Sequence, residues 1–107
     1  MITTQVQDSS RGIPAARIPV ELDIFVTGSG WIEVGHGVTN VDGHILDFRE
    51  DPAPGLYRLM FDVAMYTPDA FFPSIAITFE VRDPNRRYHI PLVLSPFGYS
   101  TYRSSGE

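Results

Sequence analysis

The chain has 107 residues, enough to bury one hydrophobic core and too few for two. Its basic residues are eight arginines with no lysine, and thirteen acidic residues bring the net charge to −5. This acidic balance argues against nucleic acid or an anionic membrane surface as a partner. The absence of cysteine excludes disulfide bonds, thiolate chemistry and cysteine-ligated metal sites.

No apolar run approaches the length of a membrane span. Residues 1–5 lack a basic segment followed by an apolar one, so we expect no signal peptide there. The last three residues do not form a peroxisomal address. We therefore expect a cytoplasmic protein that has no membrane partner.

Apolar and polar residues alternate with a period of two along most of the chain, which predicts β-strands. In chain order, the expected strands cover residues 2–6, 20–26, 31–38, 44–48, 56–63, 75–81, 88–94 and 99–103. Turn-forming residues separate them, as at 27–30, 40–43 and 83–85. Residues 64–71 allow one helical turn, which Pro68 limits. The sequence therefore predicts a single all-β domain over 1–107, a two-sheet antiparallel sandwich of seven to eight strands with at most one short helix.

The polar residues do not form a recognisable catalytic pattern by spacing alone. His36, His44 and His89 lack the spacing of a metal site, so we expect no metal, and His36 is interpreted as a surface residue. Glu21 and Asp23 alternate along one predicted strand and are interpreted as part of a solvated face. No run has the pattern of a nucleophile elbow or of a phosphate-binding loop. The residues alone therefore leave the function open.

Two longer stretches resemble one known family. The run 87–103, Arg-Tyr-His-Ile-Pro-Leu-Val-Leu-Ser-Pro-Phe-Gly-Tyr-Ser-Thr-Tyr-Arg, resembles the C-terminal signature of the 5-hydroxyisourate hydrolases, which are relatives of transthyretin. Residues 3–8, Thr-Thr-Gln-Val-Gln-Asp, and 11–15, Arg-Gly-Ile-Pro-Ala, resemble the family's Thr-His-Val-Leu-Asp and Arg-Gly-x-Pro-Ala. Shorter matches lie between them, at 37–43, 55–59, 71–73 and 79–81.

The resemblance implies a transthyretin-like sandwich that pairs edge to edge and then docks into a homotetramer, a dimer of dimers. The sites of the family lie in a channel between the dimers. The predicted strand 99–103 would have an open edge, which fits such pairing. The implied activity is hydrolytic opening of a small purine-derived heterocycle without a cofactor. A base takes a proton from water, and donor groups stabilise the oxyanion.

The family's site residues are only partly present. His89 matches the histidine of the Tyr-His-x-Pro motif, and Arg87 stands where many members have a second histidine. Gln5 replaces a histidine of the first strand, and His44 replaces the arginine after Asp-Gly. Glutamine cannot take a proton near neutral pH. Histidine can be neutral or cationic, whereas arginine is always cationic. If His44 reaches the place of that arginine, it can act either as the base or as a donor to the oxyanion.

The C-terminal residues continue the comparison. The family's terminal Tyr-Arg-Gly-Ser is matched by Tyr102 and Arg103, with Ser104 at the glycine position, Ser105 at the serine, and two extra residues after it. The resemblance thus predicts His89, His44, Gln5 and Arg103 as catalytic residues, and Ser100, Tyr102, Ser104 and Ser105 as substrate-binding residues.

Three functions compete on this basis. The first is a divergent enzyme of the family that acts on a small heterocyclic ring through His89 and His44. The second is an authentic 5-hydroxyisourate hydrolase of purine catabolism. The third is a non-catalytic protein that binds small ligands. A separate, purely structural interpretation is that His89 and Arg103 only pack and pair at a tetramer interface. We favour the divergent enzyme because the chain keeps the terminal Tyr-Arg and the last histidine, which transthyretin has lost.

Overall fold

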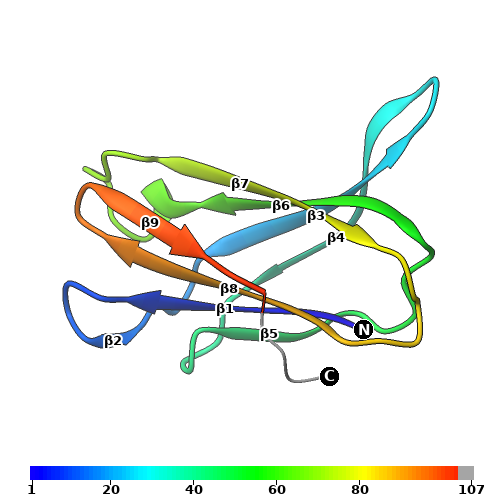
Figure 1. Ribbon diagram of the computed structural model, residues 1–107. Helices are drawn as coiled ribbons and strands as arrows, with labels where there is room; N and C mark the ends of the chain where they lie inside the picture. The colour runs from blue at the N-terminus through cyan, green and yellow to red at the C-terminus, as the bar shows by residue number, and fades with distance from the viewer. Residues whose placement is uncertain (104–107) are drawn as a thin grey trace.

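The molecule consists of two β-sheets packed face to face, as Figure 1 shows. The computed structural model describes residues 1–103, except for the side chain of Asp47. The first sheet contains β1 (Ile2–Asp8), β2 (Ile13–Pro14), β5 (His44–Arg49), β8 (Tyr88–Ser95) and β9 (Gly98–Thr101). The second contains β3 (Pro19–Val26), β4 (Gly30–Val38), β6 (Gly55–Asp62) and β7 (Ser74–Val81). A single 3-10 turn, η1 (Val63–Met65), lies between β6 and β7.

The predicted all-β sandwich is confirmed, and each predicted strand is present. The two-residue strand β2 was not predicted, because two residues are too few to show an alternating pattern. Strand β9 ends at Thr101, before the predicted end at Arg103. No helix among the described residues is long and apolar enough to cross a membrane.

The first sheet is mixed and not purely antiparallel. It has the order β2-β1-β8-β9, and β1 runs parallel to β8, from the pair Ile2 and Tyr88 to the pair Asp8 and Leu94. The other edge of β1 is shared by β5 at its start and by β2 at its end. Strand β1 is therefore central and has partners on both sides, which fixes its position among the other strands.

The second sheet is a regular antiparallel layer with the order β4-β3-β6-β7. It faces the first sheet across a core of alternate strand residues. The largest fully buried apolar side chains include Tyr57, Phe61, Leu22, Leu59 and Leu92. Two buried polar groups are satisfied inside it, since Thr4 Oγ1 donates to the carbonyl of Ile90 and Thr39 Oγ1 donates to that of Ala15.

The interpretation of Asp23 as a solvated residue is wrong, because its side chain is buried at 1% exposure. The Nε and Nη2 of Arg58 donate to Asp23 Oδ2 at 3.1 and 2.9 Å, and the guanidinium lies over the Trp31 ring. The pKa of Glu21 is raised, first by its side-chain hydrogen bond with Asp23 and then by burial. Alternation along β3 places Asp23 on the side of the sheet away from the core, but it does not reveal that Arg58 pairs with Asp23 and covers it.

Candidate functional site

The predicted histidines and glutamine lie on the surface of the first sheet that faces away from the core. In β1 the residues Ile2, Thr4 and Val6 are buried, so Thr3 and Gln5 point outward. In β8 the residues Tyr88, Ile90 and Leu92 are buried, which turns His89 outward in the same way. We call this surface, with Thr3, Gln5, His44 and His89, the outer face.

Gln5 occupies the centre of the outer face because its strand has neighbours on both sides. It pairs with His44 of β5 on one side and with Pro91 of β8 on the other. Residues directly opposite one another on neighbouring strands share a face, so His44 and Gln5 are side by side. The structure therefore brings together Gln5, His44 and His89, which the sequence places up to 84 positions apart.

His89 is held in place by Thr3, its partner residue in the parallel β1–β8 pair. A hydrogen bond of 2.7 Å joins Thr3 Oγ1 and His89 Nδ1, and its direction follows the tautomer of the ring. The pKa of His89 is lowered, chiefly by burial and then by the charges of His44 and Arg87. The ring is therefore neutral at neutral pH, and its Nε2 can accept a proton when Nδ1 carries the hydrogen.

His44 follows a tight turn that fixes it against β1. Asn40 Oδ1 accepts hydrogen bonds from the backbone N–H groups of Asp42 and His44, both at 2.9 Å. Gly43 adopts a positive φ of 77°, and a Cβ there would lie 2.4 Å from the carbonyl oxygen of Val6. Only glycine fits this position without a shift, so the Asp-Gly pair sets where β5 begins.

The C-terminal candidates lie apart from the histidines. Ser100 is exposed on the edge strand β9 opposite Val93, four residues along β8 from His89. Tyr102 and Arg103 line a hollow of about 310 Å³ at the open edge of the sandwich. The Arg103 guanidinium lies over the Tyr88 ring at 5.5 Å, and Tyr88 points into the core. The structure thus does not bring Arg103 to His89, and Ser104 and Ser105 lie outside the described residues.

Thr3 is the member of the outer face that sequence reasoning missed. The alternation of β1 placed Thr3 beside Gln5, but its contact with His89 depends on which strand lies next to β1. That neighbour is 86 positions away in the sequence. No local pattern specifies a pairing over such a distance.

The described side chains of the outer face are polar. Within residues 1–103, no three histidine, aspartate or glutamate side chains come close enough to hold a metal ion. His36 is exposed on β4 of the other sheet, where its Nδ1 lies 2.8 Å from Glu33 Oε2. A separate hollow of about 330 Å³, with Asp8, Tyr66, Phe71 and Phe97 among its lining residues, includes none of the predicted site residues. The described side chains of the outer face can transfer protons and form hydrogen bonds.

Comparison with known proteins assigns the chain to one family. The sequence profile described as the HIUase/Transthyretin family matches residues 2–104. This chain belongs to that family. The match covers β1, β5 and β8, the three strands that carry the outer face.

Members of the HIUase/Transthyretin family that resemble this chain differ in what they do. The chain is 42% identical to the uric acid degradation bifunctional protein TTL of Arabidopsis thaliana, over 97% of its own length and 37% of that protein's length. It is 40% identical to the 5-hydroxyisourate hydrolase of Deinococcus radiodurans, over 97% of this chain and 95% of that one. It also resembles the crystal structure of sea bream transthyretin in complex with thyroxine, with a TM-score of 0.90, 26% identity, and coverage of 99% of this chain and 98% of that chain.

Proposed function

We propose that this protein is a hydrolase that opens the ring of a small purine-derived heterocycle, 5-hydroxyisourate or a close relative of it. The observation that carries the proposal is the grouping of His89, His44 and Gln5 on the outer face, with the His89 ring held by Thr3. The 40% identity of this chain to a 5-hydroxyisourate hydrolase, over 95% of the length of that enzyme, supports the substrate class.

In the proposed reaction, His89 acts as the general base. Its neutral Nε2 takes a proton from water while the water oxygen bonds to a ring carbonyl carbon, whose oxygen becomes an oxyanion. The oxyanion then re-forms the carbonyl, the ring C–N bond breaks, and the protonated His89 returns the proton to the leaving nitrogen. Water is thus consumed, and the product carries a new carboxyl group and a new N–H.

We propose that His44 and Gln5 donate hydrogen bonds to the oxyanion and orient the substrate ring. Gln5 can donate and accept hydrogen bonds, but its amide acts as neither an acid nor a base near neutral pH. His44 beside it can donate through either ring nitrogen, and donors aimed at the oxyanion contribute more than contacts with the ground state. This division of roles leaves His89 as the base, because Thr3 fixes its ring.

For Arg103 we propose a role outside the site formed by His89, His44 and Gln5. Arg103 would have to leave the Tyr88 ring to touch a substrate on the outer face, so we interpret it as an anchor of the tail. Ser100, Tyr102, Ser104 and Ser105 remain predicted substrate-binding residues. The expected cytoplasmic location also remains a prediction, which fractionation of cells that express the protein would test.

We further propose that the active form is the homotetramer, a dimer of dimers. Strands β7 and β9 end the order of their sheets, and Tyr99, Ser100 and Thr101 of β9 are exposed. An uncovered edge strand offers unpaired backbone groups to a second copy. In this proposal the outer face forms one side of the site, and the facing dimer encloses it from the other side.

A stopped-flow absorbance assay with freshly generated 5-hydroxyisourate tests the proposed function. We expect the protein to accelerate decay well above the spontaneous rate, and we expect His89→Ala to lose this acceleration while keeping the native assembly. His36→Ala is the matched control, because His36 is exposed on the other sheet.

The same assay separates the competing functions. No acceleration by the folded protein would exclude 5-hydroxyisourate as the substrate and favour another ring compound or ligand binding. Full activity of His89→Ala would contradict the proposed base. The double variant Gln5→His with His44→Arg is expected to hydrolyse 5-hydroxyisourate faster if the protein has diverged from that substrate. An unchanged rate in the double variant would indicate that positions 5 and 44 do not set the activity.

A further inference from the structure

Arg87 lies at the beginning of the outer face, two residues before His89. Arg87 is exposed and immediately precedes β8, whose Tyr88 and Ile90 are buried. We infer that Arg87 continues the alternation of β8 and is directed away from the core, on the side of His89. Alternate residues of a strand are about 6.6 Å apart. The charge of Arg87 also acts on the His89 ring. One small heterocycle can therefore contact both side chains.

The backbone at Arg87 is fixed by the residue that follows it. The N–H of Tyr88 donates to the carbonyl of Met1 at 2.8 Å, which continues the parallel pairing with β1. The Tyr88 hydroxyl accepts hydrogen bonds from the N–H groups of Arg82 and Asp83 and donates to the Asp83 carbonyl at 3.1 Å. The loop that carries Arg87 is therefore held at both ends against the first sheet.

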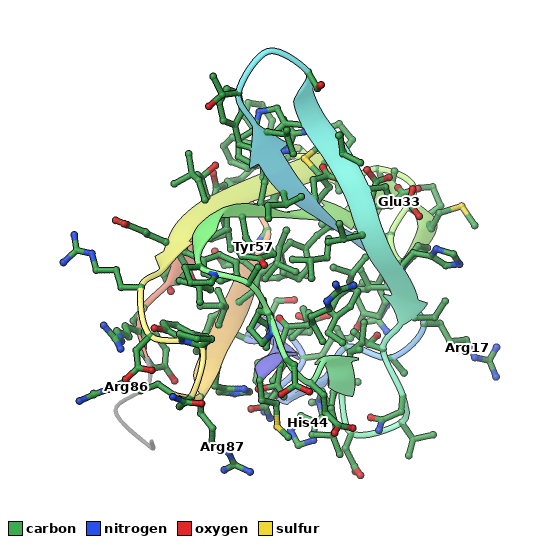
Figure 2. All side chains as sticks on the ribbon, turned by 90° about the vertical axis from the view of Figure 1, so that its right-hand side faces the viewer. Arg17, Glu33, His44, Tyr57, Arg86 and Arg87 are labelled. Carbon is green, nitrogen blue, oxygen red and sulfur yellow. The ribbon has the colours of Figure 1, made fainter. Side chains whose placement is uncertain are left out.

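The guanidinium of Arg87 differs from the other arginines of its loop. Arg82 pairs with Glu80 at 3.2 Å, and Arg86 pairs with Asp83 at 3.7 Å. Arg87 forms no ion pair with any acidic side chain that the structure describes, a set that leaves out Asp47. In Figure 2, Arg87 extends from the lower side of the molecule, where His44 also lies, whereas Arg86 points to the left. Arg87 is thus available to an anionic group on the outer face.

The charge around Arg87 favours an anion. Residues 80–87 contain three arginines and two acidic residues, a local net charge of +1 in a chain whose net charge is −5, and Arg82 and Arg86 are the arginines paired with the acids. A local positive region on an acidic protein attracts small anions and raises their concentration near the surface. Arginine binds planar groups with two oxygen acceptors through paired N–H donors, which lysine cannot reproduce in the same geometry.

We propose that Arg87, with His89, forms an anion subsite that binds the oxygen-rich, negatively charged edge of the heterocyclic substrate. This inference rests on the proposed function and adds a residue that determines substrate affinity. In it, Arg87 binds and orients the ring, and the proton transfer stays with His89. Arg87→Gln should therefore raise KM more than it lowers kcat.

Two measurements on the full chain test the subsite, with the variants Arg87→Gln, Arg87→Lys and Arg86→Gln. The first is a titration with urate, a stable purine anion, followed through the NMR signals of the His89 ring. We expect Arg87→Gln to weaken urate binding by about tenfold or more, Arg87→Lys to restore part of it, and Arg86→Gln to change it less than twofold. The second is the kcat and KM for 5-hydroxyisourate at low and high salt.

The urate titration requires no turnover, so it separates this inference from the proposed function. Loss of urate binding in Arg87→Gln supports the subsite even if no ring opening is observed. If urate binds the wild type and Arg87→Gln equally, or does not bind the wild type, the subsite is excluded while hydrolysis can still occur. An equal loss in Arg86→Gln would also overturn the inference, since general charge would then explain the binding.

Discussion

At the scale of single residues, the neutral state of His89 has a consequence for the pH dependence of the rate. Burial, together with the charges of His44 and Arg87, holds the pKa of His89 below its ordinary value of about 6.5. A base must be unprotonated to act, so kcat/KM should fall only when the pH drops through this lowered pKa. We expect the acid limb of the pH–rate profile to lie below pH 6.5, as measured in stopped-flow assays from acidic to neutral pH.

Arg87→Gln is the control for this profile. Loss of a nearby positive charge raises the pKa of His89, so the acid limb should move to higher pH. A profile that is flat through this range, or that does not move in Arg87→Gln, would contradict the assignment of His89 as the base. Among the described side chains, the groups that act on His89 are His44 from β5, the Thr3 hydroxyl from β1 and Arg87, which immediately precedes β8.

Thr3 is expected to act through His89. Thr3→Val keeps the branched shape but removes the hydroxyl that bonds to His89 Nδ1 at 2.7 Å. A hydrogen bond contributes about 1 kcal/mol, which corresponds to about fivefold in rate. We therefore expect kcat to fall by about fivefold while KM changes little. Thr3→Ser retains the hydroxyl and should recover most of the rate, and equal losses in both variants would show that Thr3 has only a packing role.

At the scale of elements, the turn before β5 determines where His44 lies. A Cβ at Gly43 would be 2.4 Å from the backbone oxygen of Val6, whereas a Cβ at Gly28, in the turn between β3 and β4, meets nothing within 4 Å. Both glycines have positive φ, at 77° and 87°. Their alanine variants therefore share the cost of this backbone conformation, about 1 kcal/mol, and differ in the clash.

We expect Gly43→Ala to destabilise the fold more than Gly28→Ala and to lower the activity as well. The clash forces β5 away from β1 and separates His44 from Gln5. Urea denaturation measures the first effect, and the hydrolysis rate of the remaining folded protein measures the second. Equal losses of stability in the two variants, with no difference in rate, would show that the position of β5 does not matter to the site.

At the scale of the whole molecule, assembly should depend on the edge strand β9. In a twofold contact both copies present the same surface, so a charge added to this strand occurs twice in the interface. Ser100→Lys should therefore weaken the proposed tetramer, with a lower mass in sedimentation at micromolar concentration. Thr27→Lys, on the exposed turn between β3 and β4, is the control. A monomeric wild type would exclude the tetramer, and equal masses for the two variants would exclude β9 as the interface.

The strands and their faces could be predicted because each is a local property. Alternation of side chains requires only neighbouring residues, and it predicted every strand longer than two residues that the structure describes. The pairings could not be predicted in the same way. That His44 meets Gln5, and Thr3 meets His89, depends on strand order in a sheet whose members are far apart in sequence. The burial of Asp23 likewise depends on Arg58, which is 35 positions away.

The family resemblance supplied part of what local patterns could not. It identified His89, His44 and Gln5 as candidates for one site, and the structure places these three on one face. It also grouped Arg103 with them, but the guanidinium lies over Tyr88 in the described chain. The resemblance transfers residue identities, whereas the direction of a side chain after the last strand depends on contacts specific to this chain.

The parallel pairing of β1 with β8 has a consequence for how the protein folds. The hairpins β3–β4 and β6–β7 close short loops and can form early, whereas β1 completes its pairing only with β8, more than 80 residues later in the chain. During synthesis the first strand emerges long before β8, and its apolar side meanwhile lacks a cover. The contact between Thr3 and His89 is therefore among the last to form, so only completely folded molecules carry an assembled outer face.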